Sequence, residues 1–171
     1  MPISRTSAPL PWSATDPLVA LLAGHSRIRD FLAGLEHLAL LSDLSAPRFR
    51  PVAAQARRYF AEGFPLQLAD EDRSLAPRLR AAFPGCAPLL ARLERDHQAI
   101  QACLATLLMV LDTFVEGRAP PRALLRVTVA SLSGLLVRHL ANEEAELFPL
   151  IDRLPAGDRA AIALELVERR A

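Results

Sequence analysis

Apolar residues recur every three or four positions along four long stretches of this chain, with polar residues between them. Such spacing puts the apolar side chains on one face of a helix, whereas a half-buried strand alternates every second residue. Representative apolar positions of this pattern, in chain order, are Leu21, Ile28, Phe60, Leu75, Leu93, Leu107, Leu132 and Leu147. No stretch shows the pattern of a strand, so we predict an all-α protein.

Turn and capping residues separate the four stretches. Asp16-Pro17 is a typical helix start, with Asp as the N-cap and Pro at the first helical position. The segments SDLSAPR, FPGCAP and EGRAPP separate successive helices, and the second helix begins near Pro47. Gly63 and Pro65 predict a kink or a break within this second helix. Because short links join antiparallel neighbours, we expect an up-down-up-down four-helix bundle.

The two ends of the chain complete this division. Residues 1–15 are rich in Pro and Ser and are expected to form an N-terminal tail, while residues 16–171 form one helical domain. The fourth long helix should end near RLPAGD, at residues 153–158. A short amphipathic helix from about Asp158 to Arg169 is expected to finish the domain.

Charge and composition limit the partners and the compartment. The 20 basic and 19 acidic side chains leave a formal net charge of +1, and the arginines are scattered, so no nucleic-acid partner is expected. The first residues lack the apolar core of a signal peptide. The longest continuous apolar run, ACLATLLMVL, is too short to span a bilayer, so we expect no membrane partner. Cys86 and Cys103 are too few for a disulfide framework, which favours a cytoplasmic protein.

One pattern of polar residues occurs twice, 72 residues apart. QLADEDRSLAP at 67–77 corresponds to HLANEEAELFP at 139–149, and both place a Glu four residues after the first position and a Pro six residues after that Glu. A His precedes each segment by 42 residues. The related residues are His25, Gln67 and Glu71 in the first copy, and His97, His139 and Glu143 in the second. We therefore expect two copies of one helical hairpin.

All six of these residues are expected at one level of the bundle. The hairpin turns are centred near Ser45 and Ala119, and at roughly 1.5 Å per residue the three histidines and Gln67 each lie about 30 Å from their own turn. The i, i+4 spacing aims the last two residues of each copy at the same face. Burying three His and two Glu together is costly unless they are paired or bind a metal.

A metal would satisfy the whole group, because carboxylates bridge cations and neutral imidazoles donate nitrogen ligands. Mixed His and Glu ligation without a Cys thiolate suits iron, as a di-iron or mononuclear centre, or manganese, better than a structural zinc site, although zinc stays an alternative. The other polar residues are expected to have structural roles. His37 should lie near the bundle end, Cys103 in the core, Asp70, Asp72, Glu144 and Glu146 on solvated faces, and Pro77 and Pro149 where their helices end or kink.

The order and spacing of His25, Gln67-xxx-Glu71, His97 and His139-xxx-Glu143 resemble the hemerythrin-like HHE cation-binding domain. The resemblance extends from about Pro17 to Leu154 and implies a four-helix bundle around a non-haem di-iron centre. It implies that His25 and residue 67 serve one iron, that His97 and His139 serve the other, and that Glu71 and Glu143 bridge them. It also implies binding or sensing of O₂, nitric oxide or peroxide, or a role in iron handling.

Gln67 departs from the family pattern, which has His at this position. An amide oxygen is a poorer donor to iron than imidazole, so we expect one firm metal position and one weak or empty one. The expected function is that of a non-haem iron-binding protein for a small diatomic or peroxide ligand, rather than that of an enzyme. Two alternatives stay open: an enzyme that processes peroxide or nitric oxide, and a metal-free helical scaffold with a decayed site. The sequence does not predict an oligomeric state.

Overall fold

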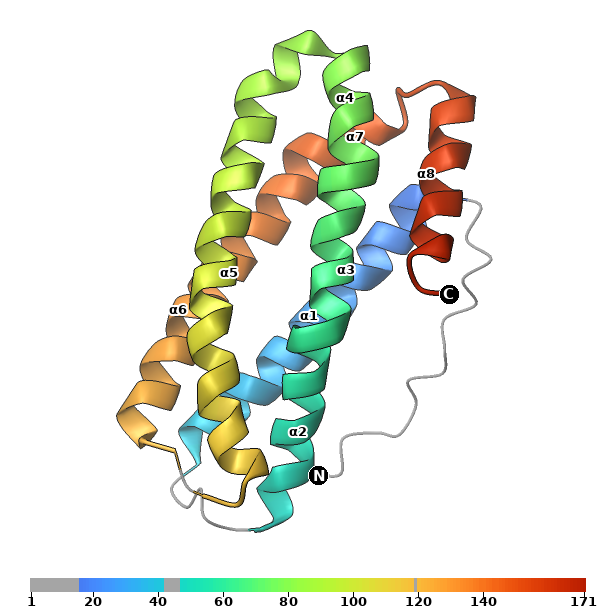
Figure 1. Cartoon of the computed structure of the whole chain (residues 1–171). Helices are drawn as coiled ribbons and strands as arrows, with labels where there is room; N and C mark the ends of the chain where they lie inside the picture. Colours follow the sequence, from blue (N-terminus) through green and yellow to red (C-terminus); the bar gives the residue numbers. More distant parts are fainter. Residues whose placement is uncertain (1–15, 42–46, 119) are drawn as a thin grey trace.

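The computed structural model describes residues 16–41, 47–118 and 120–171, and within these residues it contains helices and no strand (Figure 1). The elements, in order, are α1 (Pro17–Leu40), η1 (Pro47–Phe49), α2 (Arg50–Arg58), η2 (Tyr59–Gly63), α3 (Phe64–Ala69), η3 (Asp70–Leu75), α4 (Ala76–Ala82), η4 (Pro84–Cys86), α5 (Ala87–Val115), α6 (Arg122–Asn142), η5 (Glu143–Leu147), α7 (Phe148–Ile151) and α8 (Ala156–Glu168).

These elements form a bundle of four long helical rods. The first rod is α1, the second runs without interruption from α2 to α4, the third is α5, and the fourth runs from α6 to α7 (Figure 1). The short helix α8 packs against α1 and η3. The predicted all-α bundle with a short C-terminal helix is therefore confirmed. The predicted tail, residues 1–15, lies outside the described residues, as do the expected turn centres at Ser45 and Ala119.

The first helix begins where the sequence predicts. The side chain of Asp16 accepts a hydrogen bond from the Leu18 backbone N–H at 2.9 Å, and Pro17 occupies the first helical position. This arrangement satisfies one of the backbone donors that a helix start leaves without a partner.

Three prolines lie inside the rods, and each directly follows a widened helical turn. The π-helical turns η2, η3 and η5 close with i→i−5 hydrogen bonds, from Phe64 N–H to the Tyr59 carbonyl, from Ala76 to Glu71, and from Phe148 to Glu143. The next residue in each case is a proline, Pro65, Pro77 or Pro149. Proline has no N–H, and its ring clashes with the carbonyl four residues back, which the wider turn accommodates. The rods continue past Gly63 and Pro77, so a break or an end there is wrong, while the fourth rod ends at Ile151, just past Pro149. The alternative expectation, a kink at these places, stays a prediction.

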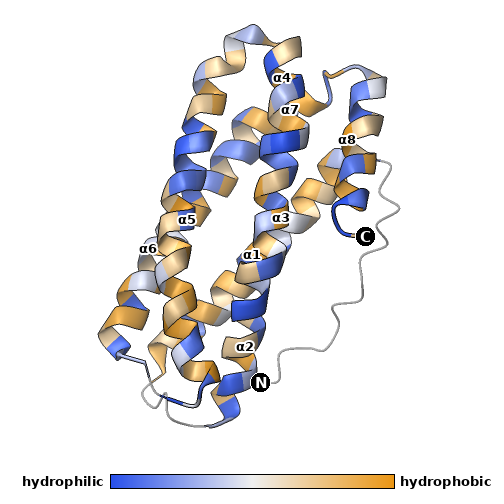
Figure 2. Cartoon of the chain, in the orientation of Figure 1, coloured by the Kyte–Doolittle hydropathy of each residue, from blue (hydrophilic) through white to orange (hydrophobic). Residues whose placement is uncertain are grey.

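The apolar core is divided into two clusters by a polar layer. One cluster includes Ile28, Leu68, Ile100 and Leu140, and the other includes Leu21, Leu75, Leu93 and Leu147. In sequence, His25, Glu71, His97 and Glu143 fall between residues of the two clusters, and Gln67 and His139 fall at the edge of the first cluster. Figure 2 shows hydrophobic and hydrophilic residues interleaved along each labelled helix.

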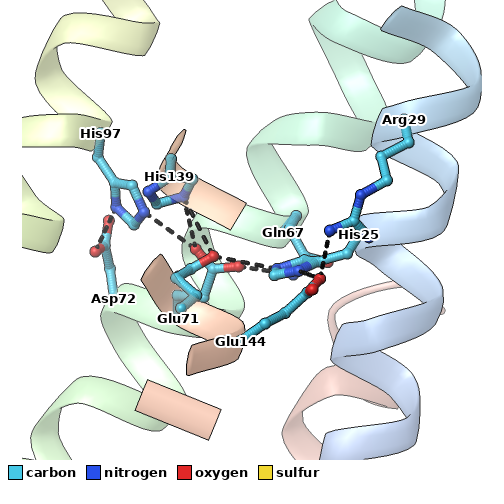
Figure 3. A network of polar contacts seen from close by, with 9 residues as sticks. His25, Arg29, Gln67, Glu71, Asp72, His97, His139 and Glu144 are labelled. Atoms are coloured by element: carbon cyan, nitrogen blue, oxygen red, sulfur yellow. Dashed lines mark hydrogen bonds and ion pairs between the residues drawn. The ribbon is translucent and has the colours of Figure 1, made fainter. Parts of the chain in front are cut away.

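Two helical segments, Pro84–Val115 and Arg122–Ile151, are long and apolar enough to cross a membrane by length and composition alone. The core helices of a soluble protein pass the same test, so the observation is weak evidence. Each segment also carries a buried histidine, His97 or His139, that points into the polar layer (Figure 3). The expected absence of a membrane partner stays a prediction.

Candidate metal centre

The six repeat-related residues meet in the polar layer of the bundle. His25 comes from α1, Gln67 and Glu71 from the second rod, His97 from α5, and His139 and Glu143 from the fourth rod (Figure 3). Their exposed fractions lie between 0% and 4%. The six side chains therefore lie at one level of the bundle, as expected, and all four rods contribute to this layer. Their role as metal ligands stays a prediction.

Four of the six residues form a tight group. Glu71, His97, His139 and Glu143 each offer a ligand atom, and these atoms all lie within 4.8 Å of one another. The Nε2 atom of His97 lies 3.0 Å from Glu71 Oε2, and that of His139 lies 3.3 Å from Glu143 Oε2. Two ligands on opposite sides of a cation, each about 2.1 Å from it, are about 4.2 Å apart. The group is therefore close to the size that one transition-metal ion requires.

The atoms facing the middle of this layer have no aligned hydrogen-bond partner among the described residues. They are His25 Nε2, His97 Nε2, Glu71 Oε2 and both carboxylate oxygens of Glu143. Buried polar atoms without partners cost free energy, and here they are nitrogen and oxygen atoms that converge from several helices. This donor set fits a cation such as iron, manganese or zinc.

A second pair of carboxylates holds the far nitrogen of two of the histidines. Asp72 Oδ1 lies 2.9 Å from His97 Nδ1, and Glu144 Oε1 lies 2.8 Å from His25 Nδ1 (Figure 3). A proton on Nδ1 donated to the carboxylate leaves the Nε2 lone pair free for a metal, the arrangement found around many metal-bound histidines. Asp72 is exposed, as expected, and Glu144 is half-buried, but the sequence did not predict that either carboxylate contacts a histidine.

These contacts cross between the two copies of the repeat. Glu71 and Asp72 of the first copy contact His97 of the second, while Glu143 and Glu144 of the second contact His25 of the first. The sequence held a signal for this role, because an acid directly follows the repeated Glu in both copies. That signal was missed because an acidic residue next to a buried one usually points to solvent in an α-helix.

Gln67 does not mirror His139 in its contacts. Its Nε2 atom donates a hydrogen bond of 2.6 Å to Glu71 Oε1. Its Oε1 atom lies over Gly24, where an added Cβ would approach it to 2.0 Å, so only glycine leaves room for this side chain. Gln67 therefore donates to Oε1 of Glu71, the carboxylate of its own copy. The Oε2 atom of Glu71 faces His97 and His139 of the second copy.

Burial and charge set the protonation of the layer. Burial lowers the pKa of His25 and lowers that of His139 to about 4, so both imidazoles are neutral near pH 7. Burial also opposes charge on His97, but its hydrogen bonds to Asp72 and Glu71 outweigh it and raise the pKa to about 10. Burial and the nearby Glu71 charge raise the pKa of Glu143 well above its usual value. Without a metal, His97 therefore carries a proton near pH 7, and Glu143 keeps its proton to a higher pH than an ordinary carboxyl group.

Asp70, next to Glu71, is fully buried rather than solvated, contrary to the sequence expectation. Its carboxylate accepts hydrogen bonds from the guanidinium groups of Arg169 and Arg170, so the end of the chain is tied to η3. Burial raises the pKa of Asp70 and the two arginines oppose that rise.

The other residues for which a structural role was expected lie where the sequence predicts. Glu146 is exposed and pairs with Arg92, as expected of a solvated acid. His37 lies exposed in the last turn of α1, away from the polar layer. Cys103 packs against the core and donates a weak hydrogen bond to the Thr128 carbonyl at 3.7 Å.

Four antiparallel helical rods around a buried His and Glu cluster define a helical-bundle protein able to bind a metal. Residues 16–151, most of the chain, match the family model of the hemerythrin HHE cation-binding domain. The chain therefore belongs to the hemerythrin HHE family, and the resemblance predicted from the repeated segments is confirmed. No curated protein sequence matches the chain.

Proposed function

We propose that this protein holds non-haem iron in the polar layer and uses it to bind or sense a small redox ligand, namely O₂, nitric oxide or peroxide. The observation that supports the proposal best is the convergence of buried atoms from His25, Glu71, His97 and Glu143 that contact one another without an aligned hydrogen bond. Bound iron supplies open coordination positions and accessible oxidation states. The protein contributes a dry, preorganised pocket and neutral imidazoles.

The proposal distinguishes two metal positions. The firm one uses Glu71, His97, His139 and Glu143, whose ligand atoms lie within 4.8 Å of one another. The weak one uses His25 and Gln67 together with the two glutamates as bridges. Gln67 weakens it because the amide nitrogen, a donor that cannot ligate a cation, is the atom that faces Glu71 at 2.6 Å.

The test is the metal content per chain, measured by elemental analysis on protein expressed with iron and purified without oxygen. One iron per chain supports the asymmetric site, and two support a working di-iron centre in which Gln67 is tolerated. No iron, with none taken up on reconstitution, rejects the proposal and favours a metal-free scaffold. The same preparation, exposed to O₂, nitric oxide or peroxide, identifies the ligand by the change in its optical spectrum.

We also propose that the protein works in the reducing cytoplasm without a nucleic-acid partner. Cys86 and Cys103 are both free thiols, in keeping with a reducing compartment, and the basic and acidic side chains are nearly balanced. Fractionation of cells that produce the protein, followed by detection in the soluble cytoplasmic fraction, tests this localisation.

A further inference from the structure

A cavity lies beside Gln67, the second metal-level residue of the first copy. Beside Gln67 lies a partly open cavity of about 210 Å³, whose walls include Gly24, Arg27, Tyr59 and Arg170. In the second copy a hollow of about 10 Å³ borders Asp96 and His139, but its other lining residues, such as Leu93, Glu143 and Leu147, do not correspond to those of the first cavity. The space beside Gln67 is well above the roughly 15 Å³ that one water requires and below the roughly 300 Å³ of a drug-sized pocket.

Particular residues of the first copy form this cavity. Gly24 replaces the related Asp96, and its lack of a side chain lets Gln67 lie against α1. Gly63, opposite it, replaces the related Leu135 and removes an apolar side chain from the wall. The Tyr59 ring is held in place by stacking on Phe31, with ring centroids 4.0 Å apart and planes 7° from parallel. The cavity therefore has a fixed shape.

The cavity wall carries positive charge. Arg27 and Arg170 line it, and none of its lining residues within the described part of the chain is acidic. Asp70 holds the Arg170 guanidinium by two hydrogen bonds and is shared with Arg169. Arg170 is also preorganised by its bond to the Leu166 carbonyl at 2.8 Å. Guanidinium groups and a tyrosine hydroxyl are donors suited to oxygen atoms that carry negative charge.

We propose that the cavity beside Gln67 binds a small oxyanion, a carboxylate or a phosphate, through Arg27, Arg170 and the Tyr59 hydroxyl. Gln67 forms the wall between this anion and the metal layer, because its side chain lines the cavity while its Nε2 atom donates to Glu71 Oε1 at 2.6 Å. An occupant would therefore lie one amide group away from the proposed weak metal position. The inference goes beyond the proposed metal function and does not require it, since all the anion-binding groups belong to the cavity wall.

The test is calorimetric titration of the full chain, in both iron-loaded and metal-free forms, at constant ionic strength. Acetate, benzoate and inorganic phosphate serve as anionic probes, and acetamide and benzamide serve as their neutral matches. We expect the anions to bind and the amides not to bind. Preference for a carboxylate identifies an organic acid as the ligand, and preference for phosphate identifies the inorganic ion. Amides that bind as well as the acids would overturn the proposal.

Matched variants locate the binding. Arg27→Gln should weaken anion binding about tenfold, the effect of losing one charge-assisted hydrogen bond, and Tyr59→Phe should weaken it less. Arg95→Gln, at an exposed position of α5 outside the cavity, removes the same charge and should leave binding unchanged. Equal effects of the two arginine variants would refute the assignment. Because the Tyr59→Phe variant keeps the stacked ring, it remains informative even if Arg27→Gln does not fold.

The proposed anion site and the proposed metal function can be rejected independently of each other. Anion binding without iron uptake would uphold this cavity and reject the proposed metal function. Iron uptake without anion binding would uphold the proposed metal function and reject the anion site.

Discussion

Replacing Asp72 by Asn should weaken metal binding at the firm position without disturbing the fold. The Asp72 carboxylate lies 2.9 Å from His97 Nδ1, on the side of the ring opposite to Glu71. It holds the ring in place and keeps the proton on Nδ1, so that Nε2 faces the layer. Asn retains an oxygen acceptor of similar shape but lacks the negative charge that makes the imidazole a stronger donor.

The expected size of the effect follows from the exposure of Asp72. Loss of such a carboxylate generally costs about 10- to 100-fold in metal affinity. The Asp72 side chain is 46% exposed, so water screens part of its charge. We therefore expect a loss near the lower end, about tenfold, which corresponds to about 1.4 kcal/mol of binding free energy.

Competition with a chelator measures the affinity of each variant for iron and for zinc. Glu146→Gln is the matched control, because Glu146 is an exposed acid of the related segment that pairs only with Arg92 among the contacts described. In the zinc-loaded protein, nitrogen NMR of His97 should show a protonated Nδ1 in the wild type and a weaker hydrogen bond in the variant. An Asp72→Asn affinity equal to that of the control would refute the reasoning, as would an unchanged Nδ1 signal.

Three further predictions address the other parts of the layer and its support. Gln67→His should raise the metal stoichiometry toward two per chain by elemental analysis, and an unchanged value would mean that Gln67 is already a competent ligand. Because the pKa of His97 is about 10 without metal and that of Glu143 is raised, binding must displace at least one proton, so apparent affinity should rise about tenfold or more per pH unit between pH 6 and 8, with proton release seen by calorimetry in two buffers. Replacing both Arg169 and Arg170 by Ala leaves the buried Asp70 charge unpaired and should lower the free energy of unfolding by about 3 kcal/mol in urea titrations.

The helical fold could be predicted from the sequence because its signals are local. The three- to four-residue apolar period, the Asp16-Pro17 cap and the Pro-rich links each act within a few residues. The expectation that the helix breaks or ends at Pro65 or Pro77 was wrong, since a rule for α-helices does not foresee a widened turn in front of a proline. A widened turn just before each proline removes the clash, and whether a chain adopts one depends on tertiary packing.

The inward-facing residues of the site were also predictable, because helical spacing fixes the face of each one. The partners of those residues were not, because they come from distant parts of the chain. Nothing near Asp70 in sequence indicates that two arginines at 169 and 170 reach it. The outer carboxylates Asp72 and Glu144 were assigned to solvent for the same reason, although both occupy the same place in the repeat.

The widened turns explain how consecutive acids reach one histidine. In an α-helix, neighbouring side chains diverge by about 100°, so Glu71 and Asp72 would face different surroundings. The turn η3 begins at this point and closes with the i→i−5 bond from Ala76 to the Glu71 carbonyl. Because more residues share each turn, adjacent side chains diverge less, and both acids contact His97. The proline six residues after each repeated Glu thus favours the turn that brings the two carboxylates to one ring.

Contacts between the two copies of the repeat explain how residue 67 can change from His to Gln while the metal position around His97 and His139 stays intact. The histidine of each copy is held by two acids from the other copy, so each set of contacts depends on the packing of the halves and not on residue 67. Gln67 donates its hydrogen bond to the Oε1 atom of Glu71. The contacts of Glu71 with His97 and His139 use its other oxygen, Oε2. A change from His to Gln at this position therefore alters the contacts of Glu71 Oε1 and leaves the second-copy histidines with their carboxylates. The cavity beside Gln67 lies on the altered side, where space and positive charge stand in the place of an imidazole.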